Sequence, residues 1–318
     1  MCTAISYRNK NHYFGRTLDY ERSFGEEVVL APRNFPLPFR QLPTMKCHHA
    51  ILGMAHVADG YPLYYDAMNE KGLCMAGLNF VGFAAYNGIG QDQVAPFEFI
   101  PWVLGQCETV AQVRELLTHT ALTETDFSIV LPAARLHWLI ADQEQAITVE
   151  SMADGLNIHD NSAGALTNNP PFPEQMRHLG SFSHLSPCPP ENHFPLALEP
   201  ISHGLGAVGL PGDLSSQSRF VRVAFTKLHS KCDESEEISQ FFHILGTVEQ
   251  VKGCCRLEDG SLEHTLYTSC CDTARGIYYY TTYGNRRITG IDMNRENLNG
   301  SSLCRYPLML SEDILLQN

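Results

Sequence analysis

The stretch MCTAISY at residues 1–7 sets the interpretation of the whole chain, because it places a cysteine directly after the initiator methionine. Initiator methionine is generally removed when the next side chain is small, so we expect maturation to remove Met1 alone. Cys2 would then carry a thiol and a free α-amine on adjacent carbons. An α-amine has a pKa of roughly 7.7–8.0, so its neutral fraction near pH 7 can take the thiol proton. Cys2 is therefore a candidate nucleophile that carries its own base.

The residues after Cys2 predict a β-hairpin. A strand over residues 3–7 is followed by a polar turn and by a returning strand over residues 12–20. Two β-rich runs across a short polar turn are typical of a hairpin. This hairpin would bring Arg16 and Asp19 back beside Cys2. A guanidinium beside a thiol favours the thiolate, and a carboxylate can orient a neighbouring ammonium group.

Several motifs together resemble the choloylglycine hydrolase family, which groups bile salt hydrolases with penicillin V acylases among the N-terminal-nucleophile hydrolases. The resemblance begins with MCTA at the start and YFGRTLDY at residues 13–20. Further stretches resemble family motifs in family order: NEKGL at 69–73, AGLNF at 76–80, LTNNP at 166–170, GLPGD at 209–213 and SSQSRF at 215–220. The resemblance covers essentially the whole chain, and ordered motifs are more specific than any one of them.

Composition excludes some classes of partner. The chain has 318 residues and a formal net charge of −13, with 35 acidic and 22 basic residues. It contains no basic run or stripe, which argues against a nucleic-acid partner. No stretch approaches the roughly 20 apolar residues that span a membrane, and the N-terminus has no apolar leader. We therefore expect a cytoplasmic protein without membrane association, and a single domain over residues 1–318, because no repeat or linker interrupts it.

The eleven cysteines predict free thiols, because their number is odd and their spacing fits no small disulfide framework. The adjacent pairs at 254–255 and 270–271 could suggest zinc. Adjacent cysteines on a strand point to opposite faces, however, and zinc sites usually separate them by two to four residues. We expect neither a metal site nor a cofactor.

Hydrophobic patterns predict an α+β protein. Strands are expected at residues 26–31, 50–55, 62–67, 72–79, 137–142, 146–150, 263–269, 276–283 and 287–293, with two further short strands before Asn168. Helices are expected at 97–104, from Thr109 with Gln112 completing a capping box, from Asp213 as N-cap to about 228, and from about 235. A loop is expected to begin at Pro170.

Two sheets stacked between layers of helices would bury the apolar faces of all these elements. Local patterns do not select that architecture uniquely. The family resemblance implies it: N-terminal-nucleophile hydrolases are four-layer αββα sandwiches with the nucleophile at one end of a central strand.

The resemblance also implies an oxyanion hole made by Asn79 and Asn168, one acting through its backbone N–H and the other through its side-chain amide. From the residues alone, an Asn at a strand end is most often a turn residue. Asn169 is the alternative to Asn168, and the Thr-Asn register of the motif favours Asn168.

Three further catalytic positions of the family match Arg16, Asp19 and Arg219. From the residues alone, Arg219 and Arg222 are three positions apart on one predicted helix and could simply be two solvated arginines on the same face. A papain-like cysteine–histidine pair is another possibility for the base. Its candidates are His12, His137 and His243, none of which lies in a family motif and each of which is better explained by a structural role.

A bile acid is a rigid apolar steroid with an anionic tail, so its site should be largely apolar with a few polar anchors. Family alignment places the pocket rim at the loops 55–61 and 127–133 and at two residues of the second strand. The predicted substrate contacts are Leu18, Tyr20, Ala58, Tyr61, Phe127, Ile129 and Leu131. This lining would also suit the phenoxyacetyl group of penicillin V.

The resemblance implies hydrolysis of the amide bond of glycine- or taurine-conjugated bile salts, with Cys2 forming a thioester acyl-enzyme. Penicillin V acylase is the first alternative, and Asn79 counts against it because well-known penicillin acylases of the family carry Tyr there. A non-catalytic, thiol-rich binding protein that retains Met1 is the second. By family analogy alone, we expect a homotetramer.

Overall fold

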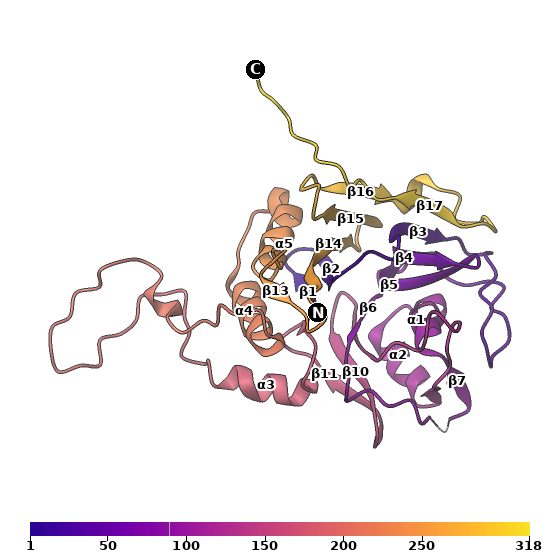
Figure 1. The fold of residues 1–318 in the computed structure, drawn as a ribbon, viewed down its shortest axis with the longest axis horizontal. Helices are drawn as coiled ribbons and strands as arrows, with labels where there is room; N and C mark the ends of the chain where they lie inside the picture. The colour runs from indigo at the N-terminus through magenta and orange to yellow at the C-terminus, as the bar shows by residue number, and fades with distance from the viewer. Residues whose placement is uncertain (89) are drawn as a thin grey trace.

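The computed structural model describes residues 1–88 and 90–318, and these residues form two large stacked β-sheets with helices on both outer faces (Figure 1). The layers are stacked in the predicted αββα order. One helix layer contains α1 (Phe99–Gln106) and α2 (Val110–Leu117). The opposite layer contains α3 (Phe172–Gly180), α4 (Ser216–His229) and α5 (Glu237–Gly246).

Sheet A contains the N-terminal hairpin. In spatial order its strands are β12 (Ala165–Leu166), β1 (Cys2–Arg8), β2 (His12–Tyr20), β14 (Leu262–Asp272), β15 (Ile277–Thr282) and β16 (Thr289–Asp292), with β13 (Cys255–Arg256) paired to β14. Sheet B contains the remaining strands of the sandwich. In spatial order they are β11 (Gly155–Asp160), β10 (Ala146–Met152), β9 (Leu136–Ala141), β6 (Cys74–Asn79), β5 (Tyr61–Asn69), β4 (Ile51–Ala58), β3 (Glu27–Ala31) and β17 (Cys304–Pro307). β7 (Asp92–Val94) and β8 (Thr120–Leu122) form a short parallel pair.

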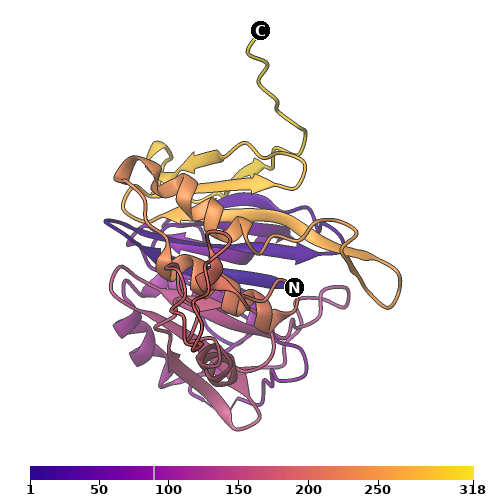
Figure 2. The same ribbon diagram turned by 90° about the vertical axis from the view of Figure 1, so that its left-hand side faces the viewer.

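The predicted hairpin is confirmed by the antiparallel pairing of β1 and β2. Its register places Cys2 opposite Leu18 and Ala4 opposite Arg16. Both strands are almost entirely buried, since sheet A is covered by sheet B on one face and by helices on the other. Figure 2 shows the indigo N-terminal strands running through the middle of the molecule. Cys2 therefore begins a central strand, as the resemblance implied.

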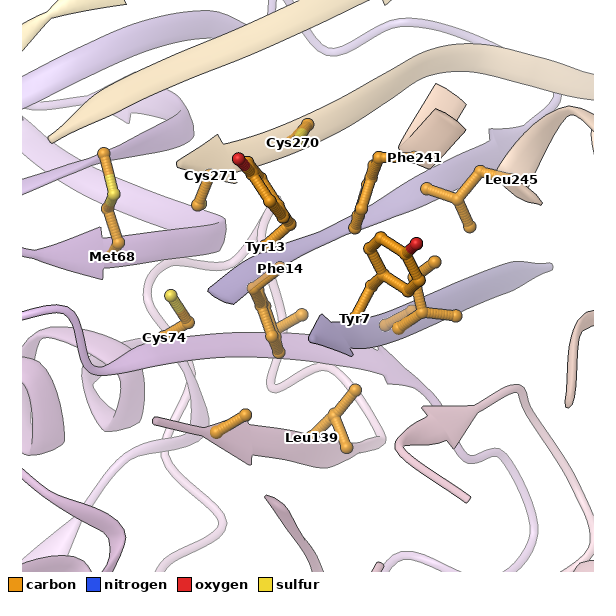
Figure 3. Close-up of a cluster of buried hydrophobic side chains, with 14 of the residues drawn as sticks. Tyr7, Tyr13, Phe14, Met68, Cys74, Leu139, Phe241, Leu245, Cys270 and Cys271 are labelled. Carbon is orange, nitrogen blue, oxygen red and sulfur yellow. The ribbon is translucent and has the colours of Figure 1, made fainter. Parts of the chain in front are cut away.

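Alternation along β2 divides its side chains between the two faces of sheet A. Phe14 is fully buried and lies near Cys74 and Leu139 of sheet B (Figure 3). Tyr13, on the opposite face, donates a hydrogen bond of 2.6 Å to Glu237 of α5. Burying a side chain such as Phe14 contributes about 1.5–3 kcal/mol, so this hairpin helps to hold the layers together as well as carrying Cys2.

The loop predicted from Pro170 onward is wrong in part, because α3 begins at Phe172. Pro171 is its N-cap residue and Pro173 lies in its first turn. Proline is tolerated there, since the first turn of a helix needs no intrahelical N–H partner. The helix predicted from Asp213 also starts later: Ser215 is the N-cap of α4, and its side chain accepts from Ser218.

The C-terminal strand β17 was not predicted. It pairs with β3 at the edge of sheet B, where Arg305 forms an ion pair with Glu27. Its four residues end in Pro307, and the half-buried Cys304 and Tyr306 alternate with the exposed Arg305 and Pro307, but an alternation this short is not distinctive in the sequence. Pairing to an existing strand therefore determines this element.

The eleven cysteines are free thiols, as predicted. Within residues 1–88 and 90–318, no cluster of three or more His, Cys, Asp or Glu side chains is arranged to bind a metal ion. In the same described residues, no helix combines the length and hydropathy needed to cross a bilayer.

Candidate active site

Cys2 opens onto a cavity of about 490 Å³ between the two sheets and the loops at their edges. Arg16 and Asn79 line the cavity with it. Most of the remaining wall is apolar or aromatic: Leu18, Tyr20, Phe24, Leu63, Tyr64, Tyr65, Val81, Pro96, Phe97, Ile100, Phe127, Val130, Leu131, Leu136 and Trp138. The volume falls within the range of about 300–1,000 Å³ that is usual for small-molecule sites. A nucleophile thus lies on the wall of an apolar chamber.

The nitrogen of Cys2 is held by Asn168. The Asn168 side-chain oxygen accepts from this nitrogen at 2.8 Å and from Nη2 of Arg219 at 2.7 Å. Both partners can only donate, which assigns the orientation of the amide. Asn168 Nδ2 in turn donates to the carbonyl oxygen of Asn79 at 2.9 Å. Asn168 thereby links the first strand of sheet A to the end of β6 in sheet B.

Arg219 is fully buried and fastens α4 to the first residues of β1. Its Nη1 donates to the carbonyl oxygen of Cys2 at 2.5 Å and to Thr3 Oγ1 at 2.6 Å. Burial lowers the pKa of Arg219, while the nearby Asp19 and Cys2 oppose that change. The arginine therefore positions both the carbonyl of Cys2 and the Asn168 amide that holds its nitrogen.

Asp19 lies behind Cys2 and outside the cavity wall. Its carboxylate accepts from Thr265 Oγ1 at 2.6 Å and from Gln250 Nε2 at 3.3 Å. Burial raises the pKa of Asp19, and the positive charge of Arg219 opposes that rise. The backbone carbonyl of Asp19 accepts from the amine of Met1 at 2.7 Å. The backbone carbonyl of Asp19 and the carboxylate of Glu263 therefore bind the amine of Met1.

Arg16 is a buried arginine of the cavity wall, 1% exposed, whereas Arg22 and Arg135 line the cavity from less buried positions. Its Nη1 donates to the carbonyl oxygens of Gly77 at 2.5 Å and Tyr65 at 3.2 Å. Burial opposes its charge, but nearby groups, led by Cys2 and Tyr267, raise the pKa of Arg16 above its ordinary value. The guanidinium is thus charged beside the thiol.

The six predicted catalytic residues consequently fall into two groups. Cys2, Arg16 and Asn79 line the cavity, whereas Asp19, Asn168 and Arg219 lie behind Cys2. Asn169 is separate from this arrangement: its Nδ2 donates outward to the carbonyl of Val81. The structure therefore places Asn168, and not Asn169, against Cys2.

Four predicted substrate contacts line the cavity, namely Leu18, Tyr20, Phe127 and Leu131. The other three do not. Ala58 is at the far end of β4, where it faces Tyr61 across the β4–β5 turn, and Tyr61 packs behind the rings of Phe97 and Phe127. Ile129 is 100% exposed, because the turn closed by Ser128 and Leu131 directs it outward.

Several lining residues were not predicted, including Arg22, Tyr64, Phe97 and Trp138, whereas His56 lies in the predicted rim loop 55–61. They come from segments separated by tens of residues, so no local motif groups them. A run such as PLYY within β5 reads as an ordinary buried strand. Only the packing of strands and loops brings these side chains to one chamber.

The histidines of the papain-like alternative have structural partners. His12 is within 3.0 Å of Ser6 Oγ, and burial lowers its pKa to about 3. His137 contacts Glu150 and the carbonyl of Thr167. His12, His137 and His243 are all absent from the described cavity wall. None of these three histidines is therefore placed to pair with Cys2.

Comparisons with known proteins agree with this arrangement. Residues 2–306 match the family described as linear amide C-N hydrolases, choloylglycine hydrolase family. A bile salt hydrolase/transferase of Lactiplantibacillus plantarum is 50% identical over 314 residues, covering 97% of each chain. The corresponding protein of Clostridium perfringens is 37% identical, covering 96% of each chain.

Solved structures have the same fold. The structure of a mutant conjugated bile acid hydrolase from Clostridium perfringens has a TM-score of 0.92 and 36% identity, with 100% of both chains covered. Penicillin V acylase from Agrobacterium tumefaciens shares the fold, with a TM-score of 0.77 at 19% identity over 97% of this chain and 92% of that one. With the family match, the relatives and the cysteine-lined cavity in agreement, this chain belongs to the choloylglycine hydrolase family of linear amide C–N hydrolases.

Proposed function

We propose that this enzyme hydrolyses the amide bond of glycine- or taurine-conjugated bile salts, with Cys2 as nucleophile. The observation that carries the proposal is the cavity itself: Cys2 lies at the wall of an apolar chamber large enough for a small molecule. The relatives named above are called bile salt or bile acid hydrolases. A steroid supplies the rigid apolar surface that such a wall would bury.

The chemistry follows from the groups around Cys2 once Met1 is removed. The α-amine takes the thiol proton, and the sulfur attacks the amide carbon to give a tetrahedral oxyanion. The amine then gives the proton to the leaving nitrogen, which departs as glycine or taurine and leaves a thioester. Water, deprotonated by the same amine, attacks the thioester, so that the bile acid is released and the thiol is restored.

The roles of the surrounding residues are part of the proposal. Arg16 stabilises negative charge on the thiol, since it lies on the same cavity wall. In this proposal Asn79, which lines the cavity, donates to the oxyanion. Asn168 was predicted as its partner in the oxyanion hole, but its Nδ2 is already bonded to the carbonyl of Asn79, so we assign it to orienting the amine through its side-chain oxygen. Arg219 holds the start of β1 from behind through the carbonyl of Cys2, and the buried carboxylate of Asp19 offsets the charge of Arg219.

The decisive experiment measures release of glycine and taurine from conjugated cholates, with penicillin V assayed beside them. We expect release from the bile salts and much slower cleavage of penicillin V. A preference for penicillin V would instead support the penicillin V acylase alternative.

The two relatives described above are also named transferases. Adding an excess of a second amino acid tests whether an amine can replace water in attacking the thioester.

We further propose that residues 1–318 act as one domain and assemble as a cytoplasmic homotetramer. The cavity draws its wall from both sheets, which supports a single functional unit. The segment between α3 and α4 extends away from the body (Figure 1) and exposes Phe194, Leu196, Leu198 and Ile201. Exposed apolar groups of this kind are typical of contacts between subunits. Sedimentation equilibrium of the purified enzyme tests the tetramer.

A further inference from the structure

Asp66 is a fully buried carboxylate that the chemistry above does not use. It belongs to β5 of sheet B, yet its three hydroxyl donors all belong to sheet A. Tyr267 donates to Oδ1 at 2.7 Å, while Ser269 and Tyr278 donate to Oδ2 at 2.8 and 2.7 Å. Three donors and no acceptor suit an ionised carboxylate. Burying such a charge is costly unless another charge compensates it.

The compensating charge is Arg16. Its hydrogen-bond acceptors are the uncharged carbonyl oxygens of Thr17, Tyr65 and Gly77, and its Nη2 has no protein partner in the described structure. Burial raises the pKa of Asp66, and the positive charge of Arg16 opposes that rise. Asp66 in turn helps to raise the pKa of Arg16. Each buried ion therefore reduces the cost of the other.

Two structural links connect Asp66 to the position of Arg16. Ser269 Oγ accepts from the backbone nitrogen of Arg16 at 3.1 Å and donates to Asp66. In addition, the pairing of β4 with β5 skips Tyr65, which is a β-bulge immediately before Asp66. The carbonyl of this bulged residue is one of the acceptors of the Arg16 guanidinium. Bulges next to active sites commonly redirect a group in this way.

We propose that Asp66 is a positioning residue for amide hydrolysis, which holds the Arg16 guanidinium beside Cys2 and balances its charge. Asp66 does not belong to the cavity wall, so it acts through Arg16 and not on the substrate. The inference rests on the proposed function, because it assigns a role within the same site. The tyrosine and serine hydroxyls fix the carboxylate across the gap between the sheets.

A double-mutant cycle separates this role from a merely structural one. The variants are Asp66→Asn, Arg16→Gln and the pair, each checked for folding by circular dichroism. Two quantities are measured: kcat and KM for glycocholate, and the rate at which iodoacetamide alkylates Cys2. In the wild-type background, Asp66→Asn should lower kcat about tenfold or more with KM changed less than about twofold. In the Arg16→Gln background, it should lower kcat by less than about twofold.

Equal losses in both backgrounds, or an unchanged kcat in Asp66→Asn, would overturn the proposal. The rate of Cys2 alkylation, which needs no substrate, should follow the same pattern: Asp66→Asn should change it in the wild-type background and have little effect in the Arg16→Gln background. Coupling in alkylation combined with no cleavage of glycocholate by the wild type would refute the proposed function alone. Additive alkylation rates in an enzyme that cleaves glycocholate would refute the role of Asp66 alone.

A matched pair of tyrosines on β15 keeps the test decisive if Asp66→Asn does not fold. Tyr278 donates to Asp66, whereas the hydroxyl of Tyr280 accepts from the backbone nitrogen of Met309. Both side chains are buried. Tyr278→Phe should lower kcat several-fold, and Tyr280→Phe should leave it unchanged. Equal kcat values in the two variants would remove the support for Asp66.

Discussion

The side-chain oxygen of Asn168 lies 2.8 Å from the nitrogen of Cys2 and accepts its hydrogen bond across 166 positions of sequence. Arg219 donates to the same oxygen. Because two donors share one acceptor, the amide is held in a single orientation. The nitrogen that would become the α-amine is therefore positioned before the chain is processed.

The first prediction is that Met1 alone is removed from the active enzyme. While Met1 is present, the nitrogen of Cys2 belongs to a peptide bond and cannot act as a base. Edman sequencing should begin at Cys2, and the intact mass should be lower than that of the full chain by one methionine residue. Full activity in protein that retains Met1 would contradict the mechanism.

The second prediction concerns Cys2→Ala and Cys2→Ser, which should fold but lose activity. Alanine removes the nucleophile, and the serine hydroxyl is too weakly acidic for an amine to activate well. Both side chains are small enough for this buried position. Glycocholate hydrolysis measures the loss, with Cys47→Ala as control because Cys47 is an exposed thiol. Activity that survives in Cys2→Ala would exclude Cys2 as nucleophile.

The third prediction compares Asn168→Ala with Asn169→Ala. Asn168 orients the amine that carries the proton, and a positioned acid–base group typically contributes about 10²–10⁴-fold, so we expect Asn168→Ala to lower kcat by roughly 10²-fold with a smaller change in KM. Within residues 1–88 and 90–318 the Asn169 side chain donates to the carbonyl of Val81 and not to Cys2, so its replacement should change kcat by less than about tenfold. Steady-state kinetics of both variants decide the matter, and equal losses would refute the assignment.

The fourth prediction is an acid instability that involves His12. Burial, followed by the positive charge of Arg8, lowers the pKa of His12 to about 3, and Asp142 partly opposes this. Between the unfolded value of about 6.5 and this folded value, the unfolded chain binds the extra proton. The free energy of unfolding should therefore decrease as pH falls through this window, by up to about 1.4 kcal/mol per pH unit.

The measurement is urea unfolding between pH 7 and pH 4, carried out for the wild type and for His12→Gln. The variant has no group that titrates at this position, so its stability should fall less steeply with decreasing pH. Its lower stability at pH 7, from the lost contact with Ser6, does not affect the slope. Parallel pH dependences would show that His12 is not responsible.

The fifth prediction links the charge of the chain to its substrate. The protein carries a formal charge of −13, so its distant field should repel anionic bile salts, and affinity must come from burial of the steroid. Salt screens exposed charges over a Debye length of roughly 8 Å and barely weakens apolar contacts. Below the micelle threshold, KM for glycocholate should stay flat or fall as NaCl rises. A several-fold increase in KM with rising NaCl would instead indicate that cavity arginines such as Arg22 and Arg135 dominate recognition of the anionic tail.

Local sequence was sufficient for the hairpin that carries the nucleophile. The apolar run after Cys2, the polar turn and the returning strand lie within 20 residues, so neither strand depends on distant partners for its identity. The helices α2 and α5 were likewise predicted, because amphipathic spacing is a property of neighbouring residues, and α1 was predicted from a local run that is apolar on most sides. The order of the four layers came from the family resemblance, since local patterns leave several stackings open.

Tertiary structure alone decided which side chains meet around Cys2. Asp66 reads as one polar residue in an apolar strand, and only the stacking of the sheets brings Tyr267 and Tyr278 to it. Ile129 looked like a wall residue, but a local turn directs it to solvent. Sequence period determines the face on which a residue lies, because Cβ direction alternates locally. What that face contacts depends on register and packing between distant segments, and no local pattern contains that information.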